Sequence, residues 1–118
     1  MEKIFVLVRE DGSPGFRAVQ GARALARYLH RFYNEELSHS MPDNIIFLSI
    51  PGGDYGRQFD KWANRFRAEK LRYTATGSYS KHSPDYFRSA IAVEAGAEHL
   101  VKDLPLFLNE HRTKPDIL

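Results

Sequence analysis

The densest group of chemically versatile side chains lies between residues 55 and 81, where seven basic residues accompany only two acidic ones. The seven are Arg57, Lys61, Arg65, Arg67, Lys70, Arg72 and Lys81. The first three recur every four residues, so on a helix they form one basic ridge. An earlier row with the same spacing comprises Arg23, Arg27 and Arg31. Such rows can follow a phosphate backbone, although a solvated helix face gives the same pattern. We therefore treat both rows as candidate contacts for nucleic acid or another polyanion.

A glycine-rich segment stands directly before the ridge. Gly52 and Gly53 would let backbone amides approach an anion at the start of a helix, and Arg57 could hold a phosphate or carboxylate. The segment lacks both the Gly-Lys-Ser/Thr ending of a P-loop and the spaced glycines of a dinucleotide site. Asp54 is a good N-cap, so a tight turn with an acidic cap is the competing interpretation.

Residues suited to catalysis or metal binding do not form a complete motif. Ser78 and His82 could act as nucleophile and base, but no nucleophile elbow accompanies them. Glu98 and His99 are adjacent, so on a helix they point in different directions and do not share one ion easily. The sequence therefore favours a non-catalytic protein without a metal or a cofactor, and leaves enzymatic activity open.

Composition predicts one globular domain over residues 1–118, with a loose tail at 113–118. The chain is 42% hydrophobic, carries a net charge of +2 and contains no cysteine. Its size suits a single core, and the absence of cysteine excludes a disulfide scaffold. The sequence contains no apolar run of about 20 residues, the length that spans a bilayer. We therefore expect a cytoplasmic protein without a membrane partner.

Hydrophobic periodicity predicts alternating strands and helices. Strands are expected at 3–9, 45–50 and 71–80, and helices at 16–37, 58–68 and 97–112. Residues 83–95 are ambiguous because Ser83-Pro84-Asp85 favours a helix start, whereas Ile91 and Val93 suit a strand paired with 71–80. We favour the helix. The expected fold is an α/β or α+β domain in the order β-α-β-α-β-α-α, with a mainly parallel sheet of three to four strands. The alternative is a ferredoxin-like α+β fold.

The same periodicity assigns the buried faces. In the helix at 16–37, the predicted inward stripe is Val19, Ala22, Leu25, Ala26, Leu29, Phe32 and Tyr33. In the helix at 58–68 it is Phe59, Trp62, Ala63 and Phe66. The strand at 71–80 would expose Thr74, Thr76 and Ser78, with Gly77 as a possible bulge.

Three functions are consistent with these patterns. The favoured one is a non-catalytic module whose basic helical surface binds nucleic acid or another polyanion. The first alternative is a small enzyme that binds a phosphorylated or carboxylated ligand at the glycine-rich turn, with Asp54 or His82 as general base. The second is a homodimeric protein-interaction domain.

Overall fold

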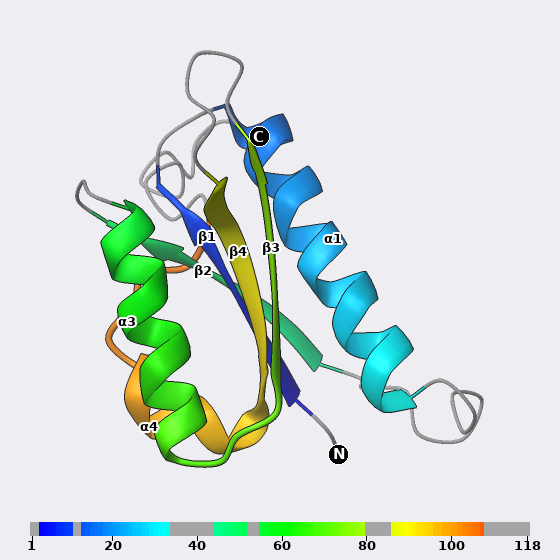
Figure 1. Cartoon of the computed structure of the whole chain (residues 1–118), viewed down its shortest axis with the longest axis vertical. Helices are drawn as coiled ribbons and strands as arrows, with labels where there is room; N and C mark the ends of the chain where they lie inside the picture. The colour runs from blue at the N-terminus through cyan, green and yellow to red at the C-terminus, as the bar shows by residue number, and fades with distance from the viewer. Residues whose placement is uncertain (1–2, 11–12, 34–43, 52–54, 80–85, 108–118) are drawn as a thin grey trace, which may run out of the picture.

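A computed structural model describes residues 3–10, 13–33, 44–51, 55–79 and 86–107 (Figure 1). The elements are β1 (Lys3–Arg9), α1 (Pro14–Tyr33), β2 (Asn44–Ile50), α3 (Tyr55–Ala68), β3 (Tyr73–Tyr79), β4 (Tyr86–Glu94), a 3-10 turn η1 (Ala95–Ala97) and α4 (Glu98–Val101). The predicted tail at 113–118 lies outside these residues.

The four strands form one mixed sheet in the order β2-β1-β4-β3. Strand β1 pairs with β2 in parallel, and β4 pairs with both β1 and β3 in antiparallel. The domain is therefore α+β, and the prediction of a mainly parallel sheet is wrong. The predicted helix at 83–95 is also wrong, because residues 86–94 form the central strand β4. A ferredoxin-like arrangement does not result either, since β1 and β2 are direct neighbours and their βαβ unit is not split.

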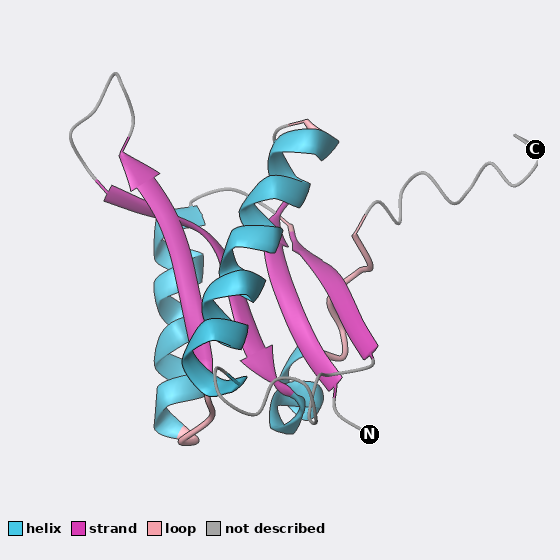
Figure 2. Ribbon diagram, turned by 90° about the vertical axis from the view of Figure 1, so that its right-hand side faces the viewer, coloured by secondary structure: helices cyan, strands magenta, loops and turns pink. Residues whose placement is uncertain are grey.

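The sheet separates two cores, with α1 on one face and α3 and α4 on the other (Figures 1 and 2). Along β1, Ile4, Val6 and Val8 pack in the cluster with α1, whereas Phe5 and Leu7 pack in the cluster with α3. All five are at most 5% exposed. The apolar run at 3–9 is thus a strand buried on both faces, as predicted.

Helix α3 buries the face that its sequence predicts. Phe59, Ala63 and Phe66 are at most 1% exposed. Trp62 is half-buried, and its ring centroid lies 5.7 Å from that of Phe66. This stripe anchors α3 to the sheet and leaves its basic residues on the outer side.

Helix α1 buries a different face from the predicted one. Val19 is 56% exposed and Ala22 is also exposed, whereas Gly21, Ala24 and Tyr28 are buried. The other members of the predicted stripe are half-buried (Leu25, Leu29 and Phe32), buried (Tyr33) or exposed (Ala26). The helix is therefore turned about its axis, so that Gly21 and Ala24 meet the sheet.

Close packing at Gly21 explains this rotation. A Cβ atom placed on Gly21 would lie 2.5 Å from Cε2 of Phe47 and 3.0 Å from Cγ1 of Val8. Such distances are shorter than van der Waals contact, so only glycine lets the helix come this near the strands. A hydrophobic-periodicity argument gives glycine no weight, which is why the predicted stripe missed it.

The inner face of α1 also carries a buried arginine. Arg17 is 3% exposed, and its Nε donates a hydrogen bond of 2.6 Å to the Arg9 carbonyl. Its Nη2 donates at 2.9 Å to Oγ of Ser49, and its guanidinium carbon lies 4.8 Å from the ring centroid of Phe107. Arg17 therefore joins the carboxyl ends of β1 and β2. The sequence does not predict this role, because arginine in a helix is usually exposed.

Strand β3 is covered on the face that we expected to be exposed. Thr74 is 8% exposed and Thr76 is fully buried. The Thr74 hydroxyl donates to the Ala24 carbonyl at 2.9 Å, so α1 covers this side of the strand. The expectation that both threonines face solvent is wrong, whereas a bulge does occur between Thr76 and Gly77, as predicted.

The C-terminal part of the described chain is less helical than predicted. Residues 95–101 form only the short turn η1 and the single-turn helix α4. Residues 105–107 run beside the outer edge of β2, where the Pro105 carbonyl accepts from Ser49 N–H at 2.8 Å and Phe107 N–H donates to the Phe47 carbonyl at 2.9 Å. Pro105 thus ends the helical region. Among the described helices, none combines the length and apolarity needed to cross a membrane.

We predict that Gly21→Ala destabilises the fold by about 1–2 kcal/mol. Overpacking against Phe47 and Val8 would outweigh the higher helix propensity of alanine. Urea unfolding with a common m-value measures the difference.

Gly15→Ala is the matched control on the same helix, because a Cβ placed there would meet nothing within 4 Å. This variant is expected to keep or slightly raise the stability. An unfolding midpoint of Gly21→Ala equal to that of Gly15→Ala would contradict the packing argument.

Candidate functional site

The last turn of α3 ends in a capping motif that sets the direction of the following residues. Leu71 N–H donates to the Phe66 carbonyl at 2.9 Å, and Lys70 N–H donates to the Arg67 carbonyl at 3.0 Å. These two bonds define a Schellman motif, in which the residue after the helix adopts a left-handed conformation. That residue is Lys70, with φ of 59°. Leu71 and Phe66 lie in the same core cluster, which fixes the turn.

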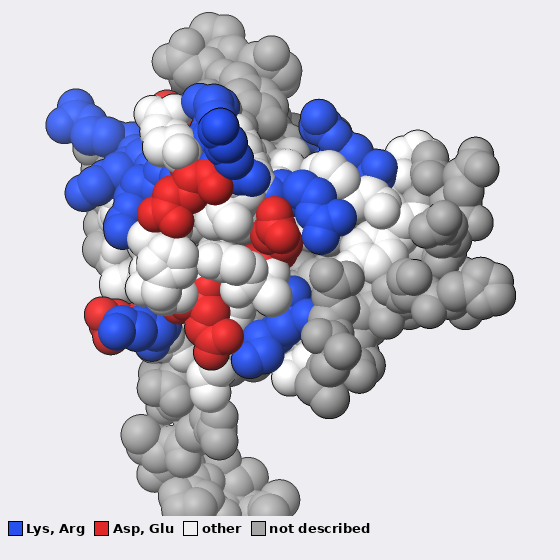
Figure 3. Space-filling view, turned by 90° about the horizontal axis from the view of Figure 1, so that it is seen from below, with Lys and Arg blue, Asp and Glu red and all other residues white. Residues whose placement is uncertain are grey.

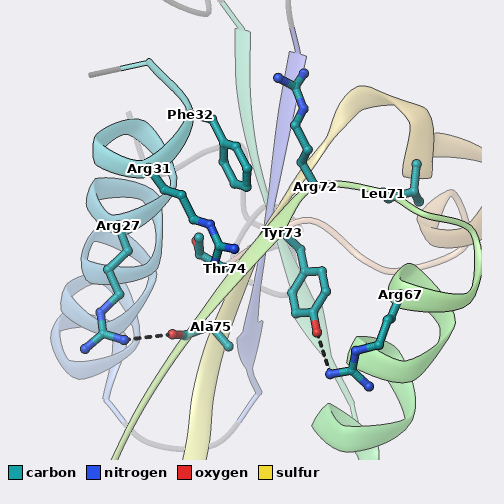
Figure 4. Close-up of a pocket in the computed structure, with 9 residues that line it drawn as sticks. All are labelled: Arg27, Arg31, Phe32, Arg67, Leu71, Arg72, Tyr73, Thr74 and Ala75. Atoms are coloured by element: carbon teal, nitrogen blue, oxygen red, sulfur yellow. Dashed lines mark hydrogen bonds between the residues drawn. The ribbon is translucent and has the colours of Figure 1, made fainter. Parts of the chain in front are cut away.

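This turn brings Arg67 and Arg72 to a groove beside strand β3 that has a volume of about 700 Å³ (Figure 4). Helix α1 lies on the other side of the groove. We call this feature the arginine groove; its lining residues are Arg27, Arg31, Phe32, Arg67, Leu71, Arg72, Tyr73, Thr74 and Ala75. Its four arginines come from helices on opposite faces of the sheet and from the segment leading into β3.

The strand that forms the floor is an edge strand with outward-facing backbone groups. Antiparallel pairing alternates residues that bond to the neighbouring strand with residues whose backbone groups point away. Glu94 N–H donates to the Arg72 carbonyl at 3.1 Å, so Arg72 faces β4 and Tyr73 and Ala75 face outward. In agreement, the Ala75 carbonyl accepts a hydrogen bond of 3.2 Å from Nη1 of Arg27.

On the α3 side, tyrosine and asparagine side chains hold Arg67. Its Nη2 donates to the Tyr73 hydroxyl at 2.7 Å, and its Nη1 donates to Oδ1 of Asn64 at 2.8 Å. Its guanidinium carbon also lies 5.9 Å from the Tyr73 ring centroid. Arginine has five N–H donors, so these two bonds leave further donors for a ligand.

On the other side, the ring of Phe32 lies close to two guanidinium groups. The guanidinium carbons of Arg31 and Arg72 are 5.4 Å and 5.6 Å from its centroid. A cation at this distance from a ring face is attracted to the aromatic quadrupole. Phe32 thus gathers two positive side chains that would otherwise repel each other.

The groove carries an excess of positive charge. Arg72 lies 3.6 Å from Oε1 of Glu94, and its backbone N–H donates to Oε2 of the same carboxylate at 2.6 Å. For Arg27, Arg31 and Arg67, the described residues include no carboxylate partner. Among the described residues, these three partly solvated guanidinium groups thus face one concave surface without a carboxylate partner, an arrangement suited to binding an anion.

The structure separates the two basic rows that the sequence singled out. Arg27 and Arg31 line the arginine groove, whereas Arg23 donates a hydrogen bond of 3.4 Å to Gln20 outside it. Arg57, Lys61 and Arg65 line a different surface depression, on the outer side of α3. The two rows lie on helices that cover opposite faces of the sheet (Figure 1).

The basic residues of the α3 ridge share their surface with a carboxylate. Asp60 lines the same depression as its three cations, and the guanidinium carbon of Arg65 lies 5.1 Å from the Trp62 ring centroid. At the lower end of the molecule, carboxylates lie between the groups of Lys and Arg side chains (Figure 3). On this face the basic side chains are thus divided into separate groups.

Some candidates lie outside the described residues, namely Gly52, Gly53, Asp54 and His82. The neighbouring candidates on the C-terminal helix have separate partners: Glu98 pairs with Lys3 at 3.4 Å, and His99 pairs with Glu69 at 3.1 Å. Within the part of the chain that the structure describes, no three His, Asp or Glu side chains group together as metal ligands.

Sequence reasoning counted Arg67 and Arg72 in the basic cluster but did not choose them as site residues. Phe32 was expected only as a member of the inward stripe of the first helix. The available signal was a pair of arginines on either side of a helix end, at 67 and 72. These two arginines form a site with α1 only because β3 is an edge strand next to that helix, and only the tertiary fold determines this.

Neither a protein-family model nor a curated protein matches this chain. The geometry and chemistry of the groove therefore carry the functional argument.

We predict that Lys70→Gly stabilises the fold by about 0.5–1 kcal/mol. A left-handed conformation costs an L-residue about 1–2 kcal/mol, and the added flexibility of glycine in the unfolded chain offsets part of the gain. Thermal and urea unfolding would both show the increase.

Lys102→Gly is the matched control, because Lys102 has φ of −60° and gains nothing from glycine. It should be neutral or slightly destabilising. If both substitutions lower the stability equally, Lys70 carries no strain in this turn.

Proposed function

We propose that the protein is a non-catalytic binding module that holds nucleic acid or another polyanion along the arginine groove. The observation that carries the proposal is the convergence of Arg27, Arg31, Arg67 and Arg72 from two sides of the sheet onto one concave surface. Guanidinium groups bind phosphate and carboxylate oxygens in a planar, often two-pronged geometry.

Neighbouring side chains hold the arginines in place before any ligand arrives. Tyr73 and Asn64 fix Arg67, and the Phe32 ring lies beside both Arg31 and Arg72. A side chain that is already ordered loses less conformational entropy on binding, so the same contacts give a higher affinity. This organisation favours the groove over the α3 ridge, which shares its surface with Asp60.

Direct titration with nucleic acid tests the proposal. Labelled DNA and RNA, in single- and double-stranded form, would be titrated at about 50 and 200 mM salt, with anisotropy as the signal. We expect binding to at least one of these ligands that weakens at the higher salt. In the double variant Arg27→Gln and Arg31→Gln, the Kd should rise about tenfold and the salt slope should fall by about 2, because two phosphate contacts are lost.

The double variant Lys61→Gln and Arg65→Gln provides the matched control. It removes the same charge from exposed positions on α3, outside the arginine groove, and should change the Kd by less than about twofold. An equal loss in both variants would show that net charge alone drives binding. Absence of binding at low salt, or binding insensitive to salt, would contradict the proposal outright.

A further inference from the structure

The shape of the arginine groove narrows the class of polyanion that fits it. We infer that the groove takes single-stranded nucleic acid in preference to a duplex; this rests on the polyanion binding proposed above. The relevant features are the concave placement of the cations, the two aromatic rings among them and the spacing of the α1 arginines.

The cations lie inside a hollow rather than on a projecting element. Arg27 donates to the edge of β3, and Arg67 donates to Tyr73, whose strand forms the floor (Figure 4). Proteins that read a duplex usually insert a protruding helix or ribbon into its major groove. Here the arginines on α1 and α3 are directed toward a shared groove between them. A thin, flexible strand can enter such a hollow, whereas a broad rod meets only its rim.

Two aromatic side chains lie among the cations. Phe32 and Tyr73 are half-buried and line the groove, so part of each ring borders the space that a ligand would occupy. Unpaired bases stack on aromatic rings and on guanidinium planes, and this stacking supplies a large share of affinity for single strands. In a duplex the bases already stack on one another and are not available for such contacts.

The arginines of α1 also suit a strand that runs along the groove. Arg27 and Arg31 are four residues apart, so their backbone positions differ by about 6 Å along the helix axis. Each can therefore contact a different phosphate of an extended backbone, while Arg67 approaches from α3 and Arg72 lies beside Phe32. Bases directed toward Phe32 and phosphates directed toward the arginines would satisfy both sets of groups.

The experiment compares three labelled ligands with the full chain: a thymine oligonucleotide of about 15 residues, a DNA hairpin whose stem has about 15 base pairs, and a poly-glutamate peptide of similar length. Anisotropy titrations at about 50 and 200 mM salt give each Kd. We expect the oligonucleotide to bind at least about tenfold more tightly than the hairpin or the peptide.

Variants of Phe32 separate stacking from charge. Phe32→Leu should raise the Kd for the oligonucleotide about tenfold and the Kd for the hairpin by less than about threefold, because both ligands lose the ordering of Arg31 and Arg72 but only the single strand loses a stacking surface. Phe32→Tyr should retain tight binding. Phe16→Leu removes an exposed aromatic ring of the same helix outside the groove and should have no effect. Urea unfolding of each variant confirms that it remains folded at the assay temperature.

The outcomes are distinct. Hairpin binding as tight as that of the oligonucleotide, with loss in the Arg27 and Arg31 variant, would overturn the single-strand inference and leave the polyanion proposal intact. Equal binding of poly-glutamate would also overturn it, because charge alone would then account for recognition. Unchanged oligonucleotide binding in folded Phe32→Leu would refute the stacking role. If none of the three ligands binds at low salt, both the inference and the proposed function are wrong.

Discussion

The close approach of α1 to the sheet at Gly21 is the constraint on which the arrangement of this protein depends. With no Cβ at that position, the helix settles against Phe47 and Val8 and presents Ala24 and Tyr28 to the core. The rotation that follows carries Arg27 and Arg31 toward the edge of β3. A wider separation or a different rotation would direct both side chains elsewhere, and the two sides of the groove would not face each other.

The other side of the groove is set by a local event, the end of α3. The Schellman turn at Lys70 reverses the chain within a few residues, so Arg67 on the helix and Arg72 before the strand both line the groove. The turn depends on Leu71 and Phe66 packing in the core, and it accepts a lysine in a conformation that suits glycine. The proposed binding surface is thus coupled to the same apolar contacts that fold the domain. Substitutions in the core beneath the turn would therefore shift the two arginines even though they do not contact them.

The sequence predicted the fold correctly where the local hydrophobic pattern matches the burial in the folded domain. Strand β1 has the predicted limits, α3 buries the predicted Phe59, Ala63 and Phe66, and the bulge occurs at Gly77. The prediction for β4 was wrong because Ser83-Pro84-Asp85 resembles a helix start. The segment is a strand because it pairs with β1 and β3, and β1 is remote in sequence. The groove could not be predicted for the same reason. Its two sides belong to elements about 40 residues apart, and their proximity depends on the order of the strands.

The hydrogen bond from Arg27 to the Ala75 carbonyl bears on the colloidal behaviour of the protein. The outer edge of a sheet is a template on which another chain can add a strand, and long, flat edges promote aggregation. Arg27 occupies one of the outward acceptors of β3, the bulge at Gly77 interrupts the regular pairing pattern, and like charges on two molecules repel each other along this side. Arg27 therefore occupies an acceptor that an added strand would need, and the charge of the neighbouring arginines opposes such an addition.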